Sequence, residues 1–342
     1  MKIVCFGEML LRLCPPEYGR FVQAERFEAC YGGSEANVAV ALANFGADCG
    51  YVTNLPAQEI GQAALNALRR YGVDTAFVNR REGRLGLYYL EKGASQRPSK
   101  VIYDRRGSAF ALAERGDFDW EEILDGADLF HFSGITPALG GNLPDICMDA
   151  IQCARRKGVT VCCDVNYRRA LWTYAEAAAV LLPMMAYTDI LIANEEHADL
   201  IFGVHALDAP EEREDLADLR EYETTARLLA EKCTLRQAVI TLRRTLSASD
   251  NVIAAVMYDT AQRKCFFSHA YTIRIVDRVG GGDALDAGLI YALLNGRSGQ
   301  ETVEFAVASS VLKHTISGDA NLISAGEADA LIQNQGKGRL TR

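Results

Sequence analysis

Short apolar segments alternate with helix-like segments along most of this chain, and that alternation limits the possible folds more than any other feature. The apolar runs at residues 2–6, 128–134, 159–165 and 189–193 are separated by stretches with helical spacing, such as residues 143–157 and 174–185. Runs that are apolar at nearly every position are typical of strands buried on both faces of a parallel sheet. The sequence therefore predicts an α/β fold in which helices cover a mostly parallel central sheet.

Length and composition suit one large domain. The chain has 342 residues, of which 49% are apolar, so a single domain over residues 1–342 has ample material for a core. No apolar run approaches the length of a membrane span, and the first residues read as a strand, not as a signal peptide. We therefore expect a cytoplasmic protein.

Charge and cysteine usage narrow the classes of partner. A net charge of −9 argues against nucleic acids and anionic membranes, but a small anion responds to a few local cations instead. The ten cysteines show no C-x-x-C spacing, so we interpret them as reduced, mostly buried thiols and not as metal ligands or disulfides. The acidic segment 208–223 is interpreted as a solvated loop or helix face.

One part of the chain departs from the alternating pattern. Residues 87–91 and 101–105 are rich in strand-forming residues and are joined by a polar loop, which predicts a hairpin. We expect it to lie outside the main sheet and to pair with early extended segments at residues 10–14 and 21–31, so that a β lid forms from about residues 11–31 and 85–106. A lid of this kind excludes water from a transfer reaction.

Three lid residues are candidates for ligand contacts. Tyr89 and Tyr103 could offer phenols to hydroxyl groups, and Arg105 could offer a guanidinium to a carboxylate. The alternative remains open, because tyrosine favours strands in general and Arg105 with its neighbour could be a solvated charge pair.

A glycine-rich segment near the end of the chain is the strongest functional signal. Gly280, Gly281 and Gly282 follow an extended run and precede a helix-like stretch, so their backbone N–H groups would face outward at a helix N-terminus. Asp283 follows them directly. A carboxylate repels a bound phosphate but suits a base that removes a proton from a hydroxyl attacking that phosphate. A glycine-rich turn with an aspartate cap would have the same sequence.

A second pair of glycines stands near the start of the chain. Gly32 and Gly33 precede an alanine-rich helical stretch that Gly46 closes, and Ser34 could cap that helix. The glycines would allow a ligand to approach the backbone, and Asn37 on the first turn could hydrogen-bond a polyol. A helix start that is merely tightly packed remains the alternative.

Polar residues follow three of the predicted parallel strands, where binding sites of such sheets gather. Arg168 follows one strand and could hold an acidic substrate or a phosphate. Asn194 and the two glutamates after it, of which Glu196 is the second, could organise metal-bound water. The third strand is expected to end at Thr241, and Arg243 follows it.

Taken together, these motifs resemble the PfkB, or ribokinase-like, family of carbohydrate kinases. Gly32-Gly33 with Asn37 and the segment 277–288 resemble the two signature regions of that family. Other strings resemble its 2-keto-3-deoxygluconate kinase branch: residues 7–13, 33–37, 103–109, 133–139, 164–168 with 171–172, and 313–315. The resemblance covers about residues 1–321.

The resemblance implies a ribokinase-like three-layer sandwich with a small β-sheet lid. It also implies that ATP and Mg²⁺ take part and that the terminal hydroxyl of 2-keto-3-deoxygluconate becomes a 6-phosphate. By position, Asp283 matches the catalytic base and Gly280, Gly281 and Gly282 match the anion hole. The residues that match substrate contacts are Gly33, Tyr89, Tyr103, Arg105 and Arg168, and Asn37 joins them as a candidate because of its place on the first helical turn. The residues expected at the nucleotide are Asn194, Thr241, Arg243 and Gly282.

Three positions depart from the family pattern. His197 stands where a metal-placing carboxylate is expected, so Glu196 is the candidate to replace it. Residues 242–249 replace the usual glycine-containing nucleotide loop and could add positive charge near the ATP phosphates. Gly281 stands where alanine is common, a difference of one methyl group that we expect to be nearly silent.

Two other functions remain open at this point. The first is a kinase of a neutral ketose such as fructose or tagatose, against which the cationic pair Arg105 and Arg168 argues. The second is a sugar-sensing protein on a degenerate kinase scaffold, against which the intact Asp283 argues. A lid with exposed strand edges also predicts a homodimer or higher homo-oligomer formed through the lid.

Overall fold

The structure is a computed structural model that describes residues 1–205 and 218–334. Its main sheet has ten strands in the order β13-β12-β11-β10-β9-β8-β1-β4-β5, with β14 paired to β12. The strands of this sheet are β1 (Lys2–Phe6), β4 (Asp48–Pro56), β5 (Val78–Arg81), β8 (Leu129–Ser133), β9 (Thr160–Asp164), β10 (Ile190–Ala193), β11 (Gln237–Thr245), β12 (Asp250–Asp259), β13 (Lys264–Phe267) and β14 (Tyr271–Arg274). The pairs from β5 through β11 are parallel, and β12 begins an antiparallel edge.

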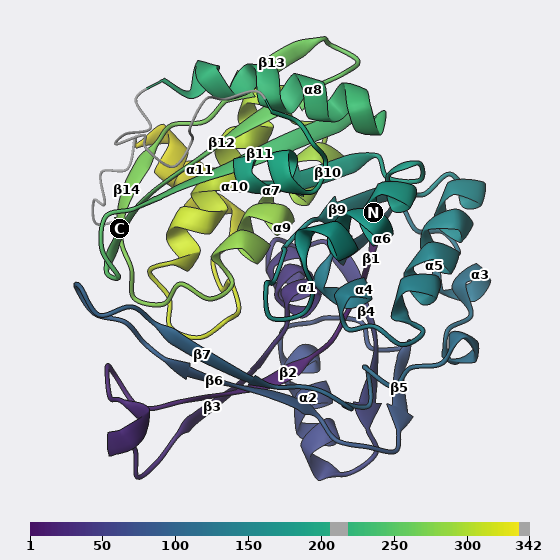
Figure 1. The fold of residues 1–342 in the computed structure, drawn as a ribbon, viewed down its shortest axis with the longest axis vertical. Coiled ribbons are helices and arrows are strands. Elements are labelled where there is room, and N and C mark those ends of the chain that lie inside the picture. Colours follow the sequence, from purple (N-terminus) through teal and green to yellow (C-terminus); the bar gives the residue numbers. More distant parts are fainter. Residues whose placement is uncertain (206–217, 335–342) are drawn as a thin grey trace.

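Helices cover both faces of this sheet (Figure 1). On one face lie α3 (Trp120–Ile123), α4 (Ile135–Ala138), α5 (Leu143–Lys157), α6 (Tyr174–Met185), α7 (Glu195–Leu200) and α8 (Glu223–Cys233). On the other lie α1 (Ser34–Asn44), α2 (Glu59–Arg70), α9 (Gly281–Leu294), α10 (Gly299–Lys313) and α11 (Ala325–Gln333). Short 3₁₀ turns occur at η1 (Phe21–Gln23), η2 (Arg115–Asp117) and η4 (Leu219–Tyr222).

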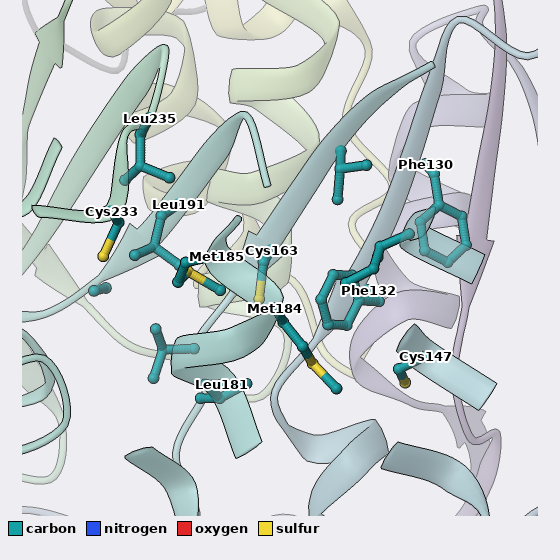
Figure 2. Close-up of a cluster of buried hydrophobic side chains, with 14 of the residues drawn as sticks. Phe130, Phe132, Cys147, Cys163, Leu181, Met184, Met185, Leu191, Cys233 and Leu235 are labelled. Atoms are coloured by element: carbon teal, nitrogen blue, oxygen red, sulfur yellow. The ribbon is translucent and has the colours of Figure 1, made fainter. Parts of the chain in front are cut away.

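The buried strands explain why two helical layers are needed. Every residue of β8 is buried, so apolar side chains leave this strand toward both helical layers. Figure 2 shows one of the two resulting cores, in which Phe130 and Phe132 of the sheet lie with Met184 and Leu181 of α6. A local signal sets the start of α6, which begins at a capping box between Thr173 and Glu176.

Four strands form a separate sheet beside the main one (Figure 1). They are β2 (Leu10–Cys14), β3 (Glu28–Gly32), β6 (Gly86–Glu91) and β7 (Lys100–Asp104), in the order β3-β2-β6-β7. These strands lie within the two segments expected to form the lid, and the name lid is kept for this sheet. The central pair, β2 and β6, is parallel, whereas β3 and β7 add to it antiparallel.

A buried arginine ties the lid to the core. Arg12 on β2 pairs with both Asp277 and Asp319, which lie in two separate core loops. Tyr88 on β6 donates a hydrogen bond to Asp319, and Lys92 Nζ lies 3.4 Å from Asp277 Oδ2. Since Arg12 and both carboxylates are almost fully buried, these ion pairs are shielded from solvent.

The predicted fold class is confirmed: a mostly parallel sheet between two helical layers, with a small second sheet. The helices α5 and α6 also lie where they were expected. Nine of the ten cysteines are buried, as predicted. Residues 208–217 of the predicted acidic segment lie outside the described residues.

Two local predictions were wrong. Residues 21–31 do not form one extended piece, because a 3₁₀ turn precedes β3. The chain after Thr241 is not a loop: β11 continues to Thr245 because each residue of its extension pairs with β12, and the turn begins only after that. In the part of the chain that the structure describes, no helix is both long and apolar enough to cross a membrane.

Candidate active site

A cavity of about 540 Å³ lies between the lid and the carboxyl ends of the parallel strands. Its lining includes Tyr88 and Tyr103 of the lid, Asp164 at the end of β9, and the start of α9. Binding sites of open α/β sheets lie at this edge. A second cavity of about 440 Å³ lies beside α3 and α5 and includes none of the glycine segment.

The glycine segment forms one wall of the larger cavity. Gly280 has φ +80° and caps α9, which begins at Gly281. A left-handed residue at this point turns the chain into the helix, and the N–H groups of Gly282 and Asp283 fall in the first turn, where no helical carbonyl precedes them. This wall can therefore bind an anion through backbone donors.

Asp283 lies at the base of this wall with both carboxylate oxygens hydrogen-bonded. Ser34 Oγ donates to Oδ1 at 3.0 Å, and Asn37 Nδ2 donates to Oδ2 at 2.7 Å. Burial raises the pKa of Asp283 to about 6, although these two donors and the charge of Arg168 oppose the rise. A carboxylate with this pKa is largely ionised at neutral pH and is a stronger base than an exposed aspartate.

Two further carboxyl groups lie behind Asp283. The side chains of Asp164 and Asp286 hydrogen-bond each other, and burial raises the pKa of both. Two carboxylates can share a hydrogen bond only if one of them keeps a proton. We infer that this pair holds one proton near neutral pH and so limits the negative charge beside Asp283.

The structure brings most of the predicted ligand contacts to the cavity. Gly33, Tyr103, Arg105 and Arg168 all belong to its lining, as does Asn37. Their environments differ. Asn37 is engaged with Asp283, and a Cβ at Gly33 would overlap the carbonyl oxygen of Glu8, so glycine is required there.

The two arginines have different partners. Arg105 is buried and donates from Nε to Oε2 of Glu8 at 2.7 Å, so its charge is already compensated. Arg168 is half-buried, donates only to the carbonyl of Tyr167 at 3.1 Å, and forms no ion pair with any described residue. Of these two arginines, Arg168 is therefore better placed to bind a carboxylate of a ligand.

The prediction for Tyr89 needs correction. It does not belong to the cavity lining and packs instead against Phe27, with ring centroids 6.2 Å apart. Its neighbour Tyr88 faces the cavity, because adjacent residues of a strand point to opposite faces. The sequence places a tyrosine on this wall, but the strand register decides which one.

The residues expected at the nucleotide also line the cavity. Asn194, Thr241 and Arg243 belong to the lining, as does Gly282. Asn194 also caps α7 by accepting a hydrogen bond from the N–H of His197 at 2.7 Å. Arg243 is exposed, and desolvation together with the nearby charges of Arg278 and Arg168 lowers its pKa.

Glu196 does not fit the metal role expected of it. Its side chain is exposed, accepts a hydrogen bond from Tyr174 at 2.6 Å, and lies outside the lining. Glu195 faces the cavity instead, because α7 begins at that residue and turns the next side chain away. Magnesium that arrives on nucleotide phosphates keeps several waters and needs only one or two carboxylates, so Glu195 fits that role.

Sequence reasoning missed two contributors to the site. Ser34 was expected to cap α1, but its hydroxyl donates to Asp283 and accepts from Asn166 Nδ2 at 2.8 Å. Asn166 has φ +39°, a left-handed conformation that asparagine tolerates better than most residues. The Asp-Val-Asn string at 164–166 was the available signal.

The expectation that glycine and alanine are nearly equivalent at position 281 was also wrong. A Cβ at this position would overlap the imidazole of His314, which fills the space beside the glycine segment. His314 is held by a 2.7 Å hydrogen bond from Nδ1 to the carbonyl of Ser310, and burial lowers its pKa to about 4. The neutral imidazole of His314 therefore occupies the space that an alanine methyl group would need at position 281.

Comparisons with known proteins agree with this geometry. The model of the pfkB family of carbohydrate kinases matches residues 1–325. The crystal structure of 2-dehydro-3-deoxygluconokinase from Thermotoga maritima superposes with a TM-score of 0.92 at 47% identity, over 97% of this chain and 99% of that one. The 2-dehydro-3-deoxygalactonokinase of Haloferax volcanii is 29% identical over 97% of this chain and 96% of its own length. The 2-dehydro-3-deoxygluconokinase of Thermoproteus tenax is 28% identical over 97% and 94%.

Proposed function

Because the chain belongs to the pfkB family of carbohydrate kinases, we propose that it transfers the γ-phosphoryl group of ATP to the terminal hydroxyl of 2-keto-3-deoxygluconate, which is 2-dehydro-3-deoxygluconate, and so forms the 6-phosphate. One observation carries the choice of a sugar acid. Arg168, which has no ion-pair partner among the described residues, lines the same cavity as the Asp283 carboxylate. The names of the similar kinases from Thermotoga maritima and Thermoproteus tenax support the same choice.

In this proposal Asp283 removes the proton from the acceptor hydroxyl as that oxygen attacks phosphorus. Ser34 and Asn37 hold the carboxylate in a fixed orientation, and its raised pKa makes it a better proton acceptor. General bases of this kind contribute about 10²–10⁴-fold to a rate. The shared proton of Asp164 and Asp286 limits the charge repulsion that an ionised Asp283 would otherwise meet.

The start of α9 binds the phosphoryl group in transfer. Backbone N–H groups of the glycine segment are held in place before the reaction, so they stabilise negative charge on the equatorial oxygens without reorganising. Arg243, Thr241 and Asn194 line the part of the cavity assigned to ATP, and Glu195 is the residue that would hold hydrated magnesium. When bound, that ion neutralises charge on the phosphates.

In this proposal Arg168 binds the carboxylate of the sugar acid. A charge-assisted hydrogen bond of this type orients a long acceptor so that its far hydroxyl lies near Asp283. Tyr103 and Tyr88 of the lid cover the acceptor and reduce the access of water.

The test is a panel of acceptors in a coupled ADP-release assay. We expect the highest kcat/KM with 2-keto-3-deoxygluconate, and we expect its C4 epimer, 2-keto-3-deoxygalactonate, to be the next best substrate. A higher kcat/KM with fructose or tagatose would refute the sugar-acid proposal and favour a neutral-ketose kinase. Binding of the acid without any turnover would favour a sugar-sensing homologue.

We also propose a homodimer, or a higher homo-oligomer, formed through the lid of a cytoplasmic enzyme. Strand β7 is a lid edge with all five residues exposed, among them Val101 at 43% and Ile102 at 55%. An apolar strand edge of this kind pairs readily with a second copy. Light scattering at micromolar concentration should give a multiple of the chain mass, and Ile102→Lys should shift it toward the monomer.

A further inference from the structure

Lys313, the last residue of α10, is fully buried and has no place in the reaction described above. Its ammonium group donates to three backbone carbonyls: those of Asp277 at 3.3 Å, Ile316 at 3.3 Å and Gly318 at 2.7 Å. An ammonium group has three N–H donors and a neutral amine has two, so the three acceptors match the charged form. Buried charges of this kind are rare unless they are compensated.

Backbone carbonyl oxygens, and not carboxylates, accept the hydrogen bonds of the charged ammonium group. Asp277 and Asp319 lie nearby, but both are paired with Arg12 of the lid. Within residues 1–205 and 218–334, Lys313 forms no ion pair at all. A cage of backbone carbonyls around one positive charge is the arrangement by which proteins hold a monovalent cation.

The carbonyl cage is directly joined to the glycine segment. Asp277 precedes that segment by only three residues, and Lys313 Cε lies 3.3 Å from the position that a Cβ on Gly280 would occupy. The N–H of Val276 donates to the carbonyl of His314 at 2.8 Å, so the end of α10 also holds the chain just before the segment. Moving the Lys313 ammonium would release both loops that support the anion-binding turn.

We propose that Lys313 is a tethered monovalent cation: its ammonium group fills a carbonyl cage and holds the glycine segment in its anion-binding position, so the enzyme needs no free K⁺ or NH₄⁺. Lys313 is thus a positioning residue, which acts on the phosphoryl group through Asp277 and Gly280. Its charge also adds to the positive potential behind the transferred group. The inference rests on the proposed kinase function.

The first measurement uses the unmodified protein. At constant ionic strength, exchange of KCl for tetramethylammonium chloride should leave kcat with 2-keto-3-deoxygluconate unchanged within about twofold, because the cage is already filled. Activation by K⁺ of about tenfold or more would overturn the proposal.

The second measurement compares Lys313→Ala with Lys313→Met. Lys313→Ala opens the cage, so kcat should fall by about 10–100-fold with little change in KM, and NH₄⁺ or K⁺ should restore at least about fivefold of it. Lys313→Met removes the charge but keeps most of the volume, so its kcat should fall similarly and stay low with either ion. A lysine that merely caps α10 would lose stability on substitution but would show no rescue by small cations.

A binding readout separates this inference from the choice of substrate. Ammonium should raise the Tm of Lys313→Ala and leave the Tm of Lys313→Met and of the wild type unchanged. This shift is expected even if the wild type fails to phosphorylate 2-keto-3-deoxygluconate, a result that would refute only the substrate. If Lys313→Ala does not fold, a folded Lys313→Met with wild-type kcat overturns the proposal, and a folded Lys313→Met with reduced kcat supports it.

Discussion

The two walls of the cavity are built from different materials. The wall formed by Gly280, Gly281, Gly282 and Asp283 consists of backbone donors and one buried carboxylate at a helix start. The wall formed by Tyr103, Arg105 and Arg168 consists of long side chains, and Tyr103 is 41% exposed. The difference indicates a division of labour, in which the first wall fixes the phosphoryl transfer and the second selects the acceptor. Each prediction below tests that division.

The largest effect is expected on the glycine wall. Asp283→Asn keeps the size of the side chain but removes the base, so kcat should fall by about 10²–10⁴-fold while ATP binding is nearly unchanged. Single-turnover kinetics with calorimetric titration of ATP checks both halves of the expectation. Asp48→Asn, at an exposed aspartate, is the matched control. A near-normal kcat for Asp283→Asn would refute the role of Asp283.

Loss of a ligand contact from the acceptor wall should raise KM for the sugar acid and leave kcat nearly unchanged. Arg168→Ala removes a charge-assisted contact worth about 1.5–3 kcal/mol, so KM for the sugar acid should rise by about 10–150-fold. KM for a weakly used neutral ketose should barely change. Equal losses on acid and ketose would show that Arg168 acts on the transfer step and would break the division between the walls.

Arg105→Ala provides the contrast within the acceptor wall. It leaves the buried carboxylate of Glu8 without its cationic partner, so the main expected effect is loss of stability, by about 3–5 kcal/mol. Thermal unfolding measures this effect. A stable Arg105→Ala protein with a raised KM for the acid would instead give Arg105 the role assigned to Arg168.

A methyl group tests how tightly the glycine wall is packed. Gly281→Ala drives a Cβ into the imidazole of His314 and should destabilise the protein by about 1–3 kcal/mol. Gly282→Ala is the matched control, since no atom lies within 4 Å of a Cβ there. Adding His314→Ala to Gly281→Ala should recover part of the loss, and no recovery would place the strain elsewhere.

The smallest effect is the pH dependence of the base. With a pKa of about 6, Asp283 is mostly ionised at pH 7 and becomes protonated as the pH falls. Below about pH 6, kcat/KM should therefore fall by about tenfold for each pH unit. The pH profile of the wild type measures the slope and the midpoint. A midpoint near the usual aspartate pKa would contradict the effect of burial.

Local sequence signals predicted the fold well, and they predicted the site less completely. The bounds of helices α5 and α6 were predicted correctly because helix caps and apolar spacing act within a few residues. Whether Tyr88 or Tyr89 faces the cavity depends on the pairing of β6 with β2, whose residues lie more than seventy positions apart. The choice between Glu195 and Glu196 likewise depends on the phase of α7. Such details require the tertiary structure.

Contacts between distant segments could not be predicted at all. Ser34, Asn166 and Asp283 come from three widely separated parts of the chain and meet only after the sheet has formed. Neither sequence periodicity nor composition shows which distant residues will come into contact. The glycine segment was predictable because its chemistry lies in consecutive residues.

The ion pairs of Arg12 constrain how a sugar can enter. Separating one buried guanidinium from two buried carboxylates would cost at least about 3–5 kcal/mol, since both partners would remain charged. The part of the lid nearest the core is therefore held rigidly and does not act as a hinge. Any gate for the acceptor must therefore lie in the parts of the lid away from Arg12.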